Sequence, residues 1–159
     1  MDLQIIKIAS DNKNQKILKK YTHEIKNKNS ICGDEITIKL LINNKIIKDI
    51  GYVCKSCVFC QASVNLLSKK IVNMNSDKAF DLCNDVINFY KSKENKMIKR
   101  LSFFKKILTE NNYSRKECLL LPFETLKKGL KSNYGKNYII IFSGTIFFFY
   151  NWCFVCVNL

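Results

Sequence analysis

Residues able to bind a metal lie in three separated places in this sequence. Cys32 and Asp34 flank a single glycine, Cys118 stands alone far along the chain, and a C-x-x-C-x-x-C run lies between them. Thiolates bind copper(I), zinc and the irons of iron–sulfur clusters, and iron or zinc usually takes four ligands in a tetrahedron. A carboxylate in one of the four positions gives a harder and more labile site than four thiolates. The residue types therefore predict a metal or cluster site.

The C-x-x-C-x-x-C run consists of Cys54, Cys57 and Cys60. Its spacing resembles the first three ligands of a bacterial ferredoxin cluster, in which a further cysteine followed by proline comes after a short gap. Here Val64 stands at that position, and residues 61–67 look helical, which does not suit a loop wrapped around a cluster. We therefore expect Cys54 and Cys60 to be neighbours of a site rather than ligands of it.

Other catalytic sets are missing from the sequence. It contains neither a P-loop nor the glycine fingerprint of dinucleotide-binding proteins, and no Ser/His/Asp set beyond the single histidine His23. A lone surface histidine is more often structural than a ligand, although a weak ligand role for His23 stays open because the chain has no other imidazole. The C-x-x-C pair Cys153 and Cys156 lies in an apolar tail and receives no role.

The composition is that of an ordinary single-domain protein. The chain has 159 residues, of which 47% are hydrophobic, and this supplies enough apolar surface for a sizeable core. The formal net charge is +14, but the lysines are scattered among Asn and Ile without an Arg-rich tract. We interpret this charge as a solvated lysine-rich surface, which could also dock an acidic partner protein, and we expect no nucleic acid partner.

The N-terminus and the cysteine content together indicate a reducing compartment. Asp2 and Lys7 interrupt the apolar residues at the start of the chain, so no secretory signal is expected. Eight cysteines without such a signal suggest thiols that are kept reduced in the cytoplasm and are available for metal or sulfur chemistry. Disulfides are the weaker interpretation.

The helices and strands around the candidate ligands must position them. The element that the sequence predicts most clearly is a β-hairpin. Residues 35–42 alternate between apolar and polar side chains, which is typical of a half-buried strand. Asn43 and Asn44 then favour a tight turn, because Asn tolerates positive φ, and residues 46–53 return as a second strand. Cys32 leads into this antiparallel hairpin, and the C-x-x-C-x-x-C run leaves it.

Helices are expected before and after the hairpin. Apolar side chains at helical spacing predict a helix within residues 1–28, followed by a Lys/Asn linker. After the hairpin, one helix begins at Ala62 and a second has Ser76 as its N-cap. A third amphipathic segment covers residues 97–108.

The last helix must present the isolated cysteine. A polar loop over residues 110–116 delivers Cys118 to the start of this helix, where Pro122 is tolerated in the first turn. Cys83, on the apolar stripe of the preceding helix, is interpreted as a small core residue.

The C-terminal tail differs in character from the rest of the chain. The 22 residues 138–159 contain no charged side chain, and about 20 residues suffice to span a bilayer as a helix. Several lysines precede them, as expected for a cytoplasmic body. One interpretation is a membrane anchor; the others are a β-rich or helical segment packed on the core, or a non-native extension of the reading frame. We therefore divide the chain into a body at 1–135 and a tail at 138–159.

Three blocks of residues occur in an order that is typical of one family. Residues 31–38 carry Cys-Gly-Asp leading into a long strand, residues 57–63 are similar to Cys-Ala-x-x-x-Ala-Ser before a helix, and residues 114–123 resemble Arg-x-x-Cys-x-Leu-Leu-Pro-Phe. In this order they resemble the iron–sulfur cluster assembly scaffolds of the SufU, IscU and NifU N-terminal type. The resemblance covers about residues 15–130 and excludes the tail.

This resemblance implies a fold, a site and a function. The fold would be α+β, with a small antiparallel β-sheet packed against several helices, as in SufE/IscU-like proteins. Cys32, Asp34, Cys57 and Cys118 occupy the positions of the family's metal ligands, and Cys118 is a candidate persulfide acceptor. Such a scaffold, which is not a classical enzyme, receives sulfur from a cysteine desulfurase, builds a transient [2Fe–2S] cluster with iron and passes it to apoproteins.

Two departures from the IscU pattern favour the SufU branch of this family. Glu117 stands where IscU proteins have a histidine before the last ligand, and Arg115 precedes Cys118 by three residues. The Leu-Pro-Pro-Val block by which IscU is recognised by its chaperone is not visible. In SufU-type members the same ligands hold zinc, so the alternative is a zinc-bound persulfide acceptor that assembles no cluster. A third hypothesis is a small membrane-anchored protein with structural cysteines.

Overall fold

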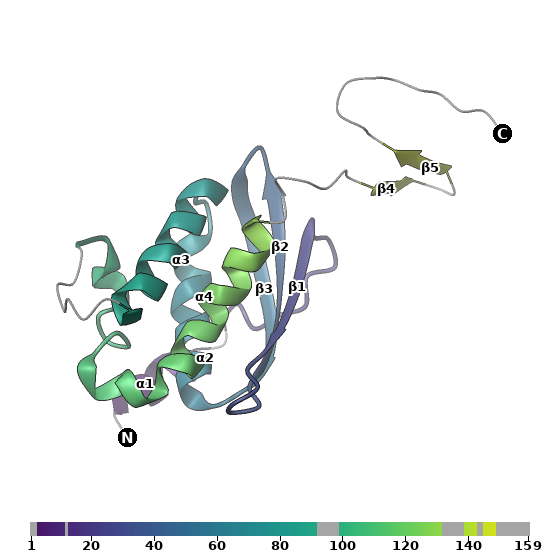
Figure 1. Cartoon of the computed structure of the whole chain (residues 1–159). Coiled ribbons are helices and arrows are strands. Elements are labelled where there is room, and N and C mark those ends of the chain that lie inside the picture. The colour runs from purple at the N-terminus through teal and green to yellow at the C-terminus, as the bar shows by residue number, and fades with distance from the viewer. Residues whose placement is uncertain (1–2, 12, 92–98, 132–138, 143–144, 149–159) are drawn as a thin grey trace.

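The computed structural model of the chain describes residues 3–11, 13–91, 99–131, 139–142 and 145–148 (Figure 1). The helices lie on one side of a three-stranded sheet, which confirms the expected α+β fold (Figure 1). In chain order the main elements are α1 (Leu3–Ala9), β1 (His23–Lys28), β2 (Glu35–Asn43), β3 (Ile46–Lys55), α2 (Val58–Ile71), α3 (Ser76–Lys91), the 3-10 helices η1 (Lys99–Phe104) and η2 (Glu110–Arg115), and α4 (Lys116–Lys131).

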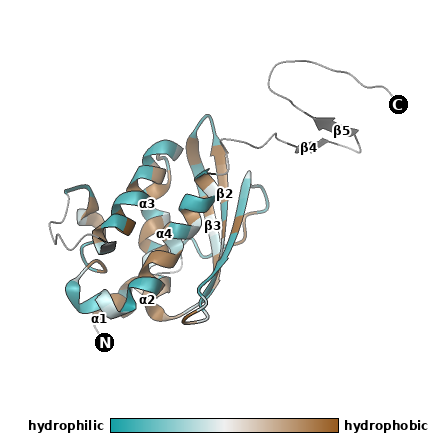
Figure 2. Ribbon diagram, in the orientation of Figure 1, coloured by the Kyte–Doolittle hydropathy of each residue, from teal (hydrophilic) through white to brown (hydrophobic). Residues whose placement is uncertain are grey.

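The sheet is an antiparallel meander with the order β1-β2-β3. Ile36, Ile38 and Leu40 alternate along β2 and are buried, and their strand partners on β3 include the buried Tyr52 and Ile50. Alternation of this kind places one apolar face of a sheet against the helices. Figure 2 shows the same division, with hydrophobic residues along β2 and β3 and mostly hydrophilic residues on β1.

The tight turn between β2 and β3 lies one residue later than the sequence predicted. Asn44 and Lys45 have φ of 48° and 60°, and Asn43 pairs with Ile46. Two consecutive positive φ angles are the mark of a type I′ turn, whose twist matches that of the flanking strands. The expectation that Asn would supply a positive φ is confirmed at Asn44, whereas Asn43 belongs to the strand.

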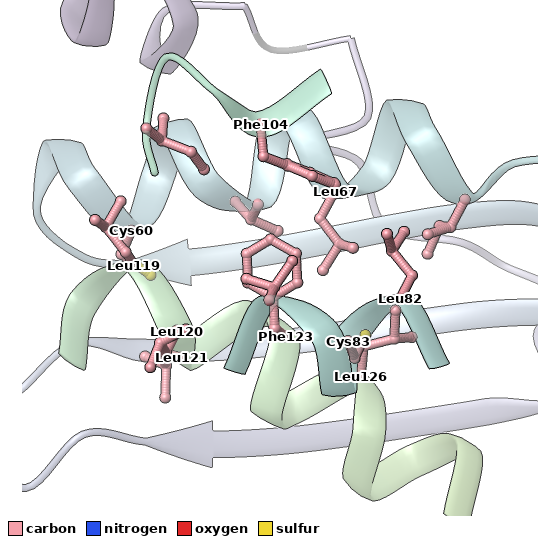
Figure 3. Packing of buried hydrophobic residues seen from close by; sticks show 14 of the residues in the cluster. Cys60, Leu67, Leu82, Cys83, Phe104, Leu119, Leu120, Leu121, Phe123 and Leu126 are labelled. Atoms are coloured by element: carbon pink, nitrogen blue, oxygen red, sulfur yellow. The ribbon is translucent and has the colours of Figure 1, made fainter. Parts of the chain in front are cut away.

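The helices α2, α3 and α4 share one core with the sheet. Figure 3 shows Leu67, Cys83 and Leu126, one from each of these helices, in the same buried cluster. The rings of Phe104 and Phe123 meet edge to face at 5.2 Å between centroids, a favourable geometry for an aromatic pair. Cys83 is fully buried, so its interpretation as a core residue is confirmed.

The N-terminal segment does not form the long helix expected over residues 1–28. Helix α1 ends at Ala9, and the stretch interpreted as a helix end and linker is the strand β1. Every residue of β1 pairs with β2, from His23 with Leu40 to Lys28 with Glu35. Sheet pairing therefore overrides the weak helical spacing of this segment.

The helix boundaries also differ from the sequence expectation. The side-chain oxygen of Asn75 accepts the N–H groups of Asp77 and Lys78 at 2.8 and 3.3 Å, so Asn75 rather than Ser76 caps α3. Helix α2 begins at Val58, four residues earlier than predicted. Met97, at the start of the third predicted amphipathic segment, lies outside the described residues, and the segment from Lys99 onward begins with η1.

The approach to the last helix is more regular than predicted. The expected loop over residues 110–116 is the 3-10 helix η2, which runs directly into α4 at Lys116. Pro122 consequently lies inside α4 and not in its first turn. Because proline has no N–H, the carbonyl of Cys118 lacks the donor that residue 122 would otherwise provide.

Part of the tail forms a small sheet of its own. The strands β4 (Ile139–Phe142) and β5 (Thr145–Phe148) pair antiparallel with each other. In the part of the chain that the structure describes, no helix is both long and apolar enough to cross a membrane. The remaining tail residues, with Cys153 and Cys156, and the proposed boundary at 135–138 lie outside the described residues.

The backbone of residues 16–18 passes close to Gly51 of β3, and this close approach allows a test of the packing. A Cβ at residue 51 would overlap the Lys16 carbonyl oxygen and lie 2.9 Å from Leu18 Cγ. Because that oxygen belongs to backbone, Gly51→Ala should lower the free energy of unfolding by about 1–3 kcal/mol, measured by urea denaturation. The exposed Val53 serves as the control on the same strand face, and Val53→Thr should change stability by less than about 0.5 kcal/mol. Equal stability of Gly51→Ala and wild type would contradict this close approach.

Candidate metal centre

The turn between β1 and β2 carries the first two candidate ligands. The Asn29 N–H donates to the Asp34 carbonyl at 2.8 Å, and the Gly33 N–H donates to the Asn29 carbonyl at 2.9 Å. Gly33 has a φ of +73°, a conformation that side chains with a Cβ rarely adopt. The turn thus leaves Cys32 exposed at the surface and turns Asp34 inward, where it is only 5% exposed.

The start of α2 is joined to this turn through Asp34. Cys57 is the N-cap of α2, and its backbone N–H donates to Asp34 Oδ1 at 2.9 Å. The second carboxylate oxygen, Oδ2, is buried and has no hydrogen-bond partner among the described residues. A buried carboxylate oxygen without a partner is costly, and a bound cation would remove that cost.

The start of α4 completes the group. Cys118 is the third residue of α4, and the neighbouring Leu119 carbonyl accepts a hydrogen bond from the Ser63 hydroxyl of α2 at 2.6 Å. This bond joins α4 to α2 one residue away from the ligand. The Cys118 thiol donates to the Cys32 sulfur at 3.5 Å, across 86 residues of sequence.

Three of the four sequence-predicted ligands therefore meet closely. Ligand atoms of Cys32, Asp34 and Cys118 all lie within 4.8 Å of one another. The fourth, Cys57, adjoins them, because its thiol interacts with both Asp34 and Cys118. With Cys57 as a fourth ligand, these residues could offer three thiols and one carboxylate, a mixed donor set that suits tetrahedral iron or zinc. The unpartnered Asp34 Oδ2 fits such an ion as well.

The surroundings of Cys57 and Cys118 raise the pKa of both thiols and so favour their protonated form. Burial raises the pKa of the Cys118 thiol, and its hydrogen bonds to the Cys32 and Cys57 sulfurs raise it further. Burial also raises the pKa of the Cys57 thiol, with the Asp34 carboxylate acting in the same direction, while the Cys60 amide and the Cys118 thiol oppose the shift. A metal must therefore displace these protons before it can bind thiolate.

Cys54 and Cys60 make contacts of other kinds. The Cys54 thiol donates to Gln61 Oε1 at 2.7 Å, and Cys60 is fully buried in the core cluster. His23 begins β1 and Cys32 follows its end, so the strand separates them by about 20 Å. His23 is thus not part of this group.

The sequence interpretation missed Asn29. Its side-chain oxygen accepts the N–H groups of Ile31 and Cys32 at 2.8 and 3.4 Å, which folds the ligand turn onto it. The signal was available, because Asn commonly bonds backbone amides two residues ahead in turns.

The raised thiol pKa values predict a steep pH dependence of metal binding. Zinc binds cysteine as thiolate, so the protons on Cys57 and Cys118 must leave when zinc binds. The apparent affinity should therefore rise with pH by about tenfold per pH unit for each proton released. Calorimetric zinc titrations in buffers of different ionisation enthalpy would count the protons.

Asp34→Asn is the matched control for this proton count, since an amide oxygen can still accept the Cys57 N–H while the thiols of Cys32, Cys57 and Cys118 remain. It should bind zinc more weakly but with the same pH slope. A pH-independent affinity of the wild-type protein would contradict the buried, protonated thiols.

The chain is similar to known proteins over most of its length. Residues 3–137 match the family model described as NifU-like N terminal domain. The chain is 29% identical over 106 residues to the iron–sulfur cluster assembly scaffold protein IscU of Thermotoga maritima, a match that covers 65% of this chain and 73% of that protein. It is also 29% identical over 119 residues to an uncharacterized protein of Borreliella burgdorferi, which covers 75% and 82%.

Solved structures share the fold. A putative iron–sulfur cluster assembly scaffold protein for the SUF system from Fervidobacterium islandicum superposes with a TM-score of 0.69 at 24% identity, covering 82% of this chain and 96% of that one. The N-terminal part of a NifU-like protein from Brucella abortus gives 0.68 at 17% identity, covering 82% and 91%. Taken with the match over residues 3–137, these findings show that the chain belongs to the NifU-like N-terminal domain family.

Proposed function

We propose that this protein is an iron–sulfur cluster assembly scaffold. It accepts sulfur from a cysteine desulfurase, binds iron, builds a transient [2Fe–2S] cluster on Cys32, Asp34, Cys57 and Cys118, and passes the cluster to recipient apoproteins. The observation that carries this proposal is the meeting of Cys32, Asp34 and Cys118 within 4.8 Å, from segments far apart in sequence. Family membership and the scaffold named IscU among its relatives support the same function.

The donor set suits a cluster that is bound only transiently before it is transferred to another protein. One carboxylate among three thiolates gives fewer strong soft-metal bonds than a closed four-thiolate site. Cys32 is also exposed, so the cluster would lie at an open edge of the fold rather than inside it. Both features favour transfer over permanent storage.

Sulfur delivery uses thiol exchange. A thiolate of the site attacks the outer sulfur of the desulfurase persulfide, the sulfur–sulfur bond breaks, and the desulfurase cysteine leaves as thiolate. This step moves neutral sulfur without net oxidation. Its later reduction to sulfide takes two electrons, which a thiol or ferredoxin-type reductant must supply.

Cys118 is the proposed persulfide acceptor, and the exposure of its neighbour offers a second candidate. Cys118 is 5% exposed, whereas Cys32 is exposed and its sulfur lies 3.5 Å from that of Cys118. A donor persulfide arriving from solvent would thus meet Cys32 first. Mass spectrometry of the singly substituted proteins after incubation with a desulfurase would locate the added sulfur.

The alternative is a zinc-bound persulfide acceptor that assembles no cluster. The same donor set fits tetrahedral zinc, and Glu117, next to Cys118, stands where IscU proteins carry histidine. Both functions use the same residues, so the nature of the bound metal and product separates them.

Anaerobic reconstitution with ferrous iron, cysteine, a desulfurase and a thiol reductant tests the scaffold function. The wild-type protein should develop the visible absorption and Mössbauer signature of a [2Fe–2S] cluster. Cys32→Ser, Cys57→Ser and Cys118→Ser should each lose most of it, because each removes one of the four ligands. Cys54→Ser is the matched control, since the Cys54 thiol donates to Gln61 Oε1, and this variant should assemble the cluster normally.

Two outcomes would contradict this function. Tightly bound zinc with stimulated desulfurase turnover and no cluster would support the zinc alternative instead. Unchanged metal content in all three ligand variants would indicate that the cysteines are structural.

A further inference from the structure

Asn29 is the residue that closes the ligand turn, although it is not itself a ligand. It follows β1 directly and is 9% exposed. Its backbone N–H bonds the Asp34 carbonyl, and its carbonyl accepts the Gly33 N–H, at 2.8 and 2.9 Å. Two backbone hydrogen bonds therefore join Asn29 to the part of the turn that ends in the buried carboxylate.

The side chain of Asn29 organises the other half of the turn. Its Oδ1 accepts the Ile31 N–H at 2.8 Å and the Cys32 N–H at 3.4 Å. The amides of three consecutive residues, 31 to 33, are thus directed at Asn29 through its side chain and its carbonyl. This turn has its hydrogen-bond partners within the protein, so it can hold its shape before a metal arrives.

Cys32 is the ligand that most needs such a support. Asp34 and Cys118 are buried, whereas Cys32 is exposed and follows Ile31, which is 80% exposed. Few packing contacts restrict an exposed loop residue, so its backbone hydrogen bonds set its position. A ligand held in place before binding loses less conformational freedom when the metal binds.

We propose that Asn29 is a positioning residue of the metal centre, whose side-chain oxygen holds the Cys32 backbone so that the Cys32 sulfur stays beside Cys118 and Asp34. This inference rests on the proposed metal site and adds a determinant of its affinity. Residues outside the ligand set that orient ligands commonly contribute about 10- to 100-fold in metal affinity. The Asn29 side chain acts here on the backbone amide of Cys32 and not on the Cys32 sulfur.

Metal titrations of three variants test this role without any cluster chemistry. Asn29→Ala removes the acceptor and should lower zinc and cobalt(II) affinity by about tenfold or more and speed zinc release to a chelator. Asn29→Asp keeps an oxygen at the same position and should retain most of the wild-type affinity. Asn27→Ala is the matched control, because Asn27 lies on β1 two residues earlier and its side chain accepts from Lys128 Nζ at 2.9 Å; it should bind as wild type does.

Two measurements separate a change in the position of Cys32 from a general loss of protein stability. They are the absorption spectrum of the cobalt(II)-loaded proteins and urea denaturation of the metal-free proteins. Asn29→Ala should show a weakened thiolate-to-cobalt charge-transfer band in protein that is still folded. If Asn29→Ala does not fold, hydrogen exchange of the metal-free wild-type protein decides: protected Ile31 and Cys32 amides support the proposal, and exchange at unstructured rates overturns it.

The outcomes also separate this inference from the scaffold function. Wild-type and Asn29→Ala proteins with equal affinity and equal zinc release would overturn the role of Asn29 even if the cluster assembles. A protein that binds cobalt(II) in an Asn29-dependent way but assembles no cluster would contradict only the scaffold function. A wild-type protein that binds neither metal would overturn both.

Discussion

The buried carboxylate of Asp34 is the constraint around which the functional end of this fold is arranged. One oxygen accepts the backbone N–H of Cys57, the N-cap residue of α2, and the other is buried without a partner among the described residues. The positive end of the helix dipole at the start of α2 favours a negative group there. It does not replace a partner for the second oxygen, and a buried charge needs compensation. A cation bound beside Asp34 Oδ2 would supply the missing interaction.

Three different segments of the chain bring cysteines toward that carboxylate. The β1–β2 turn supplies Cys32, the junction of β3 and α2 supplies Cys57, and α4 supplies Cys118. Helix α4 is held by contacts outside the site, such as the bond from Ser63 of α2 to the Leu119 carbonyl and the edge-to-face pair of Phe104 and Phe123. Among the candidate ligands, Cys32 of the β1–β2 turn is exposed, whereas Asp34 and Cys118 are buried.

Much of this could be predicted from sequence because the informative patterns were local. Alternation in β2, the Asn-rich turn and the Cys-Gly-Asp block each reflect interactions within a few residues. The strand β1 could not be recognised, because HEIKNK has one apolar side chain and becomes a strand through its pairing with β2. The early start of α2 was missed for a similar reason: its N-cap is a cysteine with no side-chain capping bond, and Asp34 from another segment approaches its N-terminus. Tertiary contacts of this kind are invisible to a local pattern.

The 86-residue separation of Cys32 and Cys118 has a consequence for biosynthesis. While the ribosome is still making α3, the emerging polypeptide holds only the N-terminal donors, and the last thiol has yet to be translated. Domains fold as units once enough chain has been made, so the four-donor arrangement comes into being only on a completed and correctly folded body. Under the proposed function, capture of iron at this site would therefore wait until translation of the body is finished.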